Sequence, residues 1–431
     1  MMQRALLLLV FFISNSILAQ VNRCYTKEYI EYRNSLNPLY KQNLEGCYNL
    51  ISSSINNNSP RDFSTIRIPV VVHVLHSAEN QNLTDSLVRS QINILNEDFS
   101  RLNYDTNLTR EIFKPFASAT GIEFYLAQFD PSGAPTTGIV RKQTDVNSFF
   151  SITDLDVMKS DANGGSDAWP TDQYLNVWVC NLAIPFLNIP VILGFATPPN
   201  GAPNWPDGTG ASVPQNDGVV VHFEVFGSNL SATGTLEAVN RGRTLVHEVG
   251  HYLGLRHIWG DPGQGENGCD VDDGLEDTPN SAAANQQTCA YSANSCSITP
   301  DDFPDMIENY MDYSDENCMN MFTLQQAEAM RFVVENFRPT LLLSIKKNLA
   351  TTSLLTTYPN PALNQISIQH NSANLNGLLI VRDLSGKVIF SNEIVGSNSK
   401  IDLEINHLTQ GIYFIELKTQ TARYFCKFSK I

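Results

Sequence analysis

The sequence predicts an α+β protein, in which a mixed, twisted sheet with helices packed against it is followed by a small antiparallel β-sandwich. Between about residues 62 and 340, segments of strand-like composition alternate with segments of helical apolar spacing. From about residue 350, short alternating strands are separated by turns. A chain of 431 residues is also long for one domain. We therefore expect one domain over residues 62–340 and a second over residues 350–431.

The first 19 residues have the pattern of a signal peptide. Arg4 gives a positive start, Ala5–Ile13 is an apolar run too short for a membrane span, and Ala19 offers a cleavage site. No later stretch is long and apolar enough to cross a bilayer, so we predict a secreted protein without a transmembrane segment. Residues 20–61 are polar and include a tail rich in Ser and Asn. They are predicted to be a pro-segment and a flexible, cleavable linker.

Strand and helix signals alternate through the first domain. Ile68–Leu75 is rich in β-branched residues, as in a buried strand. A helix is expected to start at Thr84, because apolar residues recur after it at every third or fourth position. Further strands are expected at residues 122–126, 174–182, 192–197 (a candidate edge strand) and 218–225.

The next helix carries the motif around which the chain is organised, His247-Glu248-x-x-His251-x-x-Gly254-x-x-His257. Residues four apart lie on one face of a helix, so His247 and His251 can share a metal ion, with Glu248 beside it as a base. Three consecutive turns cannot converge on one ion, but Gly254 can end the helix with a positive φ and let His257 return. Three His ligands leave a fourth position open, as in catalytic zinc sites. The motif predicts a zinc peptidase.

The formal net charge of −16 argues against nucleic acid and anionic membranes as partners. Most of this charge lies in the acidic segment, residues 258–328, which has fifteen Asp and Glu and no Lys or Arg. Such a cluster of carboxylates is costly without cations, so we favour structural calcium there, although a pocket for basic substrate side chains is an alternative.

Eight cysteines are present, and disulfides are expected in a secreted chain. Four of them lie between residues 269 and 318 and are expected to form two disulfides, with three pairings open. Two alternatives stand for the pro-segment: Cys24 binds the zinc as a thiolate and blocks water, or it forms a disulfide with Cys47. After the acidic segment, Thr323 and Gln326 predict a capping box that starts a final helix ending at Arg338-Pro339.

The zinc motif together with Met311 in Asn309-Tyr310-Met311-Asp312-Tyr313 resembles the metzincin metallopeptidases. The Cys-rich acidic segment and strand 68–75 are similar to the pappalysin family in its bacterial, ulilysin-like branch. This resemblance implies a metzincin fold over residues 62–340, catalytic zinc and cleavage of protein or peptide substrates. It implies zinc ligation by His247, His251 and His257, Glu248 as general base, Met311 as the Met-turn and Tyr313 as the group that stabilises the intermediate.

The same resemblance implies further features. The disulfides would be Cys269–Cys296 and Cys289–Cys318, and calcium would bind in the acidic segment, for which our candidates are Asp272, Asp273, Asp277 and Thr278. The family often prefers a basic residue just after the cut bond, and Asp312, Asp315 and Glu316 are compatible with that preference. Cys24 resembles the latency cysteine of the family pro-segment, although Tyr25 follows it where Gly is expected.

The tail resembles the sorting domain of the type IX (Por) secretion system. Tyr358-Pro359-Asn360-Pro361, Gly411-Ile412-Tyr413 and the basic end carry this likeness. It implies the secretion machinery as a partner, removal of the tail, and release or attachment at the outer cell surface.

The sequence thus predicts a secreted zinc endopeptidase. Two alternatives are a non-catalytic surface-binding protein with a vestigial metal site and a zinc hydrolase acting on non-peptide bonds.

Overall fold

The structure is a computed structural model that divides into two units, residues 1–342 and 343–431. The predicted signal peptide lies outside the residues that the structure describes. The described residues are 21–55, 64–151, 155–185, 189–190, 192–199, 214–230, 234–263, 266–297, 302–342, 355–369, 375–383, 387–397, 400–419 and 423–431.

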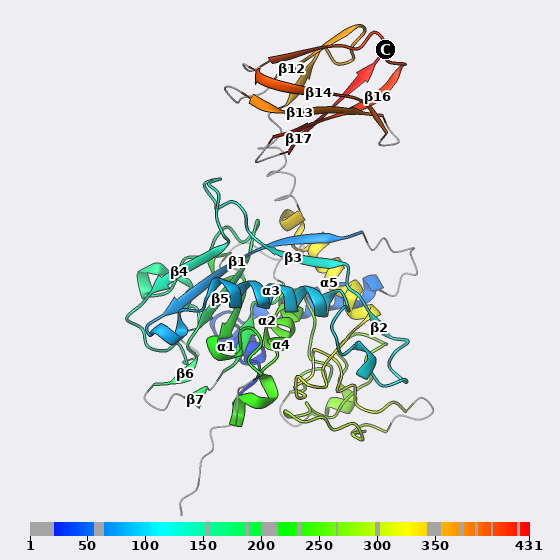
Figure 1. The fold of residues 1–431 in the computed structure, drawn as a ribbon. Helices are drawn as coiled ribbons and strands as arrows, with labels where there is room; N and C mark the ends of the chain where they lie inside the picture. The colour runs from blue at the N-terminus through cyan, green and yellow to red at the C-terminus, as the bar shows by residue number, and fades with distance from the viewer. Residues whose placement is uncertain are drawn as a thin grey trace, which may run out of the picture. The chain divides into compact units, whose positions relative to one another are not determined.

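The first unit contains the predicted mixed, twisted sheet (Figure 1). Its strand order is β3-β1-β5-β9-β8, and β4 also pairs with β1. All these pairs are parallel except β8 with β9, which makes β8 the antiparallel edge that the sequence suggested. The bounds are β1 Ile66–His76, β3 Ile122–Leu126, β4 Ile139–Gln143, β5 Leu175–Cys180, β8 Gly194–Ala196 and β9 Val219–His222.

The strand expected over residues 218–225 is shorter than predicted. It ends at His222, and Phe223–Val225 forms a 3-10 turn. The His222 ring accepts a hydrogen bond from the Leu182 main-chain N–H at 3.0 Å and contacts Glu224 at 3.0 Å, and these contacts accompany the turn. Apolar composition alone did not reveal this local hydrogen bonding.

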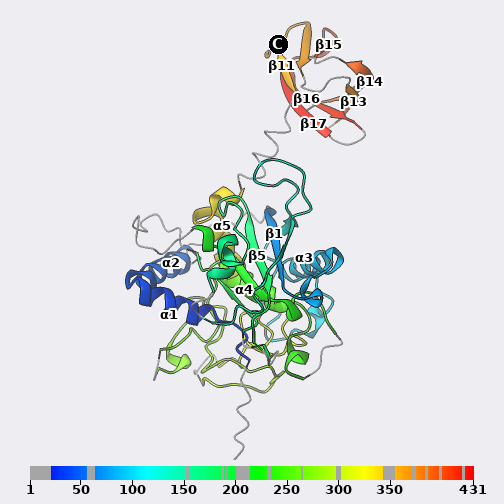
Figure 2. The same cartoon turned by 90° about the vertical axis from the view of Figure 1, so that its left-hand side faces the viewer.

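Helix α3 (Asp85–Phe99) packs on β3 and α4, and α4 (Arg243–Tyr252) packs on β8 and β9 (Figures 1 and 2). The side chain of Thr84 caps α3 by accepting from the Leu87 N–H. The predicted capping box starts α5 (Leu324–Asn336).

Residues 21–55, which we predicted to belong to a pro-segment and the start of a flexible linker, form two helices. These are α1 (Thr26–Leu36) and α2 (Leu39–Ile55), and the second helix includes the start of the expected Ser- and Asn-rich tail. Helix α2 packs on α5 and α1 contacts β8. Cys47, Ile51 and Ile55 join the core of the first unit, so tertiary burial stabilises a helix that its polar composition did not indicate.

The second unit consists of two antiparallel sheets around one apolar core. One has the order β11-β12-β15 and the other β14-β13-β16-β17. This agrees with the predicted antiparallel architecture. Its strands are β11 Thr356–Tyr358, β12 Gln365–Gln369, β13 Leu375–Arg382, β14 Val388–Ser397, β15 Lys400–Glu404, β16 Gly411–Lys418 and β17 Arg423–Lys430. Among the described residues of the chain, no helix has the length and apolarity that a membrane span requires.

Candidate metal centre and active site

Helix α4 ends where the motif predicts. His247 and His251 lie in the helix, and Gly254 follows it with a φ of 90°. A Cβ atom at Gly254 would lie 2.7 Å from Val333 Cγ2, so both conformation and space favour glycine. The turn that this glycine makes brings His257 back toward the helix.

The three imidazoles converge. His251 Nε2 lies 3.1 Å from His247 Nε2 and 3.0 Å from His257 Nε2. The Nδ1 atom of each ring contacts an oxygen, at the main chain of Tyr310 (2.7 Å) and Leu255 (2.8 Å) and at the carboxylate of Asp261 (2.7 Å). A carbonyl can only accept, so His247 and His251 carry their protons on Nδ1 and turn Nε2 inward.

These rings suit a metal cation. Burial and the neighbouring imidazoles lower the pKa of His247 and lower that of His251 to about 3, so both are neutral. Inward-facing lone pairs about 3 Å apart repel one another unless a cation lies between them. Among the described residues, the only group of three or more His, Cys, Asp or Glu with ligand atoms this close comprises these histidines and Cys24, all within 4.8 Å. The donors fit zinc.

Cys24 and Cys47 are both free thiols, so the alternative of a disulfide between them is wrong. The Cys24 Sγ is buried at the histidine cluster and lies 3.5 Å from Glu248 Oε2. Burial, together with the charge of Glu248, raises the pKa of this thiol. A thiolate there therefore requires a cation beside it.

Glu248 is fully buried next to the histidines. Burial raises the pKa of its carboxyl to about 8, although hydrogen bonds from Cys24 and Thr26 oppose the shift. The Thr26 hydroxyl donates to Glu248 Oε2 at 3.1 Å and accepts from the Ala196 N–H of β8 at 2.9 Å. Sequence reasoning did not find Thr26, because its partners are remote in the chain.

Met311 and Tyr313 lie beside the centre, as the resemblance implies. Met311 packs directly under Gly250 of α4, where a Cβ would collide with its sulfur. The Tyr313 ring lies 5.0 Å from the His257 ring, and its hydroxyl donates to the Cys24 carbonyl at 3.2 Å. A buried phenol beside the metal ligands can stabilise negative charge on an oxygen.

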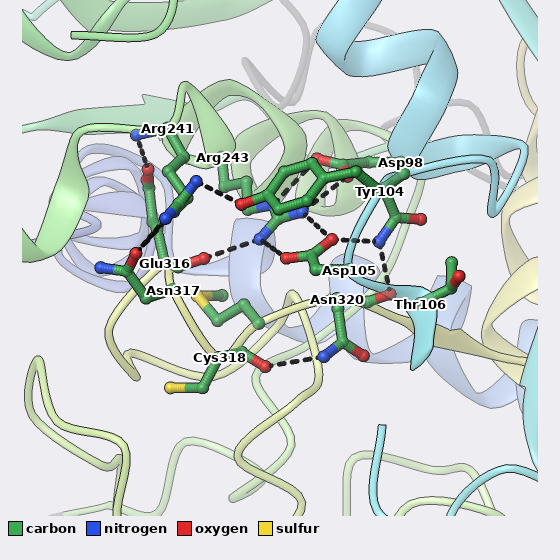
Figure 3. Close-up of polar contacts among 12 residues, drawn as sticks. Asp98, Tyr104, Asp105, Thr106, Arg241, Arg243, Glu316, Asn317, Cys318 and Asn320 are labelled. Carbon is green, nitrogen blue, oxygen red and sulfur yellow. Dashed lines mark hydrogen bonds and ion pairs between the residues drawn. The ribbon is translucent and has the colours of Figure 1, made fainter. Parts of the chain in front are cut away.

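Arg23 lies next to the centre and is bound by residues that follow Tyr313 in the chain. The guanidinium donates to the Ser314 carbonyl and lies 3.4 Å from Glu316 Oε1, with both side chains almost fully buried. Glu316 also accepts from the Arg241 N–H at 2.6 Å (Figure 3). The Thr244 hydroxyl donates to the same carboxylate at 3.1 Å. Of the three acidic residues proposed for specificity, Glu316 is the one that faces a basic side chain. Arg23 was missed as a site residue, although it is adjacent to Cys24.

The acidic segment has the two disulfides that the resemblance implies, Cys269–Cys296 and Cys289–Cys318. The calcium candidates do not form a second close cluster among the described residues. Asp277 accepts from Thr323 and the Gln325 N–H at the start of α5, and Thr278 donates to Asp273 at 2.8 Å. Asp272 accepts from Gly274.

The sheet, the zinc helix with its glycine turn and the methionine beside it define a metzincin-type zinc metallopeptidase. A profile of the pregnancy-associated plasma protein-A peptidases matches residues 159–335, and one of the secretion-system C-terminal sorting domains matches residues 356–430. An extracellular metalloprotease of Arthroderma benhamiae is 30% identical over 308 residues, which cover 71% of this chain and 84% of that protein. The chain belongs to the pappalysin family of metallopeptidases.

Solved structures of metallopeptidases are also similar to this chain. Mature mirolysin of Tannerella forsythia in complex with a cleaved peptide is 40% identical, with a TM-score of 0.56 and coverage of 67% of this chain and 98% of that one. A promirolysin variant from the same organism is 37% identical, with a TM-score of 0.62 and coverage of 75% and 98%. The protein is thus a secreted zinc metalloendopeptidase with a sorting tail, rather than a binding protein with a vestigial site.

Proposed function

We propose that the chain is made as a latent endopeptidase that hydrolyses peptide bonds with Glu248 as general base and favours a basic residue after the cut bond. The observation that carries the proposal is that the segment 23–26 contacts the metal-ligand cluster, the base Glu248, Tyr313 and Glu316 at once.

The chemistry follows from the groups around the histidines. His247, His251 and His257 would hold zinc, which when bound lowers the pKa of a coordinated water and polarises a carbonyl. The Glu248 carboxylate accepts the proton of the attacking water and passes it to the leaving amine. The Tyr313 hydroxyl donates to the carbonyl oxygen as negative charge develops there. The same hydroxyl already donates to a peptide carbonyl, that of Cys24.

Latency follows from the position of the pro-segment. Cys24 supplies a fourth ligand atom, and the Thr26 hydroxyl donates a hydrogen bond to the base Glu248. The segment also runs along the edge strand β8, where Tyr25 N–H donates to Gly194 O at 2.9 Å and Leu193 N–H donates to Asn22 O at 3.1 Å. An edge strand offers such groups to any extended peptide. The pro-segment therefore occupies the place where an extended substrate would pair.

Specificity follows from Arg23. Its buried guanidinium faces Glu316, a carboxylate held by the start of α4. When the pro-segment leaves, the Glu316 carboxylate loses this cation. A basic substrate side chain would restore the pair, whereas an apolar one would leave the carboxylate unpaired.

We also retain two broader proposals. Calcium binds in the acidic segment, and a buried oxygen supports this, since Asp273 Oδ2 has no hydrogen-bond partner within the described part of the chain. The second unit engages the secretion machinery and is then removed, which its match to sorting domains supports.

The test is cleavage of a diverse peptide library by the protein made as the full chain and then activated by removal of the pro-segment, beside Glu248→Ala and a zinc chelator. Cuts abolished by both controls, with Arg or Lys after the cut bond, are expected. Cuts without that preference would refute the role of Glu316 and leave the chemistry standing. A Glu248→Ala variant with wild-type turnover would refute the chemistry.

A further inference from the structure

The three metal-ligand histidines are oriented by different kinds of partner. The Nδ1 partners of His251 and His257, Leu255 and Asp261, each lie four residues along the chain. The partner of His247 is the carbonyl of Tyr310, which is 63 residues away. The orientation of His247 therefore depends on where a remote segment is held.

The side chain of Tyr310 fixes that segment. Its hydroxyl donates to Asp98 Oδ1 of α3 at 2.7 Å, and both residues are buried. Its main-chain N–H donates to Met321 O at 3.0 Å. The residue is thus held from both ends: the phenol is bound to α3, while the carbonyl accepts from His247.

Arg243 connects the helix that carries His247 to Asp98, the partner of the Tyr310 hydroxyl. It is the first residue of α4, four residues before His247. Its guanidinium contacts Asp98 at 3.2 Å and Asp105 at 2.7 and 2.8 Å, and it donates to the Glu316 carbonyl at 2.7 Å (Figure 3). Helix α4 is therefore joined to Tyr310 twice, directly through His247 and indirectly through Arg243 and Asp98.

We propose that Tyr310 is a positioning residue for His247, and that Asp98 and Arg243 hold its phenol so that its carbonyl fixes the ring with Nε2 toward the metal. A phenol that served stability alone would be replaceable without any change at the metal. If the phenol positions His247, its replacement should change the metal site, because loss of the hydrogen bond to Asp98 frees the Tyr310 carbonyl to shift. Partners of this second layer are worth roughly 10- to 100-fold in metal affinity or activity.

The test is Tyr310→Phe in the full chain, which removes one hydroxyl and leaves Asp98 paired with Arg243. The matched control is Tyr174→Phe, since Tyr174 is a mostly buried phenol whose hydroxyl donates to the Phe129 carbonyl at 3.0 Å on another part of the sheet. Zinc affinity is measured by competition with a chelator, and the absorption spectrum of the cobalt-substituted chain reports the ligand field. After activation, kcat and KM are measured separately.

We expect Tyr310→Phe to weaken zinc binding by about tenfold, to change the cobalt spectrum and to lower kcat with little change in KM. Tyr174→Phe should leave all these quantities as in the wild type, whatever its thermal stability. Wild-type zinc affinity and an unchanged cobalt spectrum in folded Tyr310→Phe would overturn the proposal. So would equal changes in Tyr174→Phe, because they would trace the effect to general destabilisation.

Discussion

The buried pair of Arg23 and Glu316 offers a sharp test of specificity through Glu316→Gln. The substitution keeps the size of the side chain and removes its charge. Arg23 and Glu316 lie 3.4 Å apart with side chains 1% and 0% exposed, so solvent screening does not weaken the pair as it would on the surface. A charge-assisted hydrogen bond contributes about 1.5–3 kcal/mol. Because 3.4 Å is long for such a bond, we take about 2 kcal/mol, or roughly 30-fold in kcat/KM.

The assay compares two peptides that differ only after the cut bond, where one has arginine and the other citrulline, its neutral analogue of the same shape. The ratio of their kcat/KM values should fall about 30-fold in Glu316→Gln, mainly through slower cleavage of the arginine peptide. Glu316 also accepts a hydrogen bond from the Arg241 N–H at 2.6 Å, and the amide of the glutamine variant would face the same N–H. Any general damage from that contact acts on both peptides and cancels in the ratio.

The matched control is Asp315→Asn, which removes a negative charge from the residue next to Glu316. The Asp315 side chain is partly exposed and accepts from the Asn317 N–H at 2.8 Å. Its ratio should change less than about threefold, since an exposed charge is screened. An unchanged ratio in Glu316→Gln would refute the pairing argument. An equal fall in both variants would replace it with a diffuse effect of the acidic segment.

Three further predictions concern latency, pH and the glycine turn. Cys24→Ser should raise the activity of the uncleaved chain only partially, measured on a quenched peptide before and after activation, because Thr26 still contacts the base. Burial lowers the pKa of His73 to about 4, so between pH 6.5 and pH 4 only the unfolded chain gains a proton at this residue. The free energy of unfolding of the wild type should therefore fall by up to about 3 kcal/mol over this pH range. Denaturant titrations should show a smaller loss in His73→Gln. Gly254→Ala should lower the unfolding free energy by more than about 1 kcal/mol and weaken zinc retention, since its φ is 90° and Val333 lies in the way; a wild-type midpoint and zinc content would contradict this.

Much of the site is readable from sequence because its geometry is local. The spacing of His247 and His251 and the turn at Gly254 are consequences of helical periodicity and one positive φ. The cap of α5 is equally local, because Thr323 and Gln326 satisfy each other within one turn. Such features require no knowledge of distant contacts.

Other features depend on partners far along the chain. The carboxylate of Asp277, a candidate calcium ligand, accepts from Thr323 and Gln325, more than 40 residues later, and no local pattern indicates these partners. Helices α1 and α2 are polar in composition and gain their stability from burial against β8 and α5. Arg23 and Thr26 look like surface residues until the fold buries them at the site.

The contacts of residues 23–26 differ in chemistry, and this difference bears on how latency would end. The Cys24 sulfur lies among the metal-ligand histidines, and the Cys24 carbonyl accepts from Tyr313. The Thr26 hydroxyl donates to the base Glu248, and the Arg23 guanidinium pairs with Glu316. Removing one of these groups leaves the other three in place, and α2 still packs on α5. We therefore infer that oxidation or substitution of Cys24 alone frees one ligand position without admitting an extended peptide to β8. Full activity requires the whole segment to leave, which a cut in the linker after α2 permits only if the helices then dissociate.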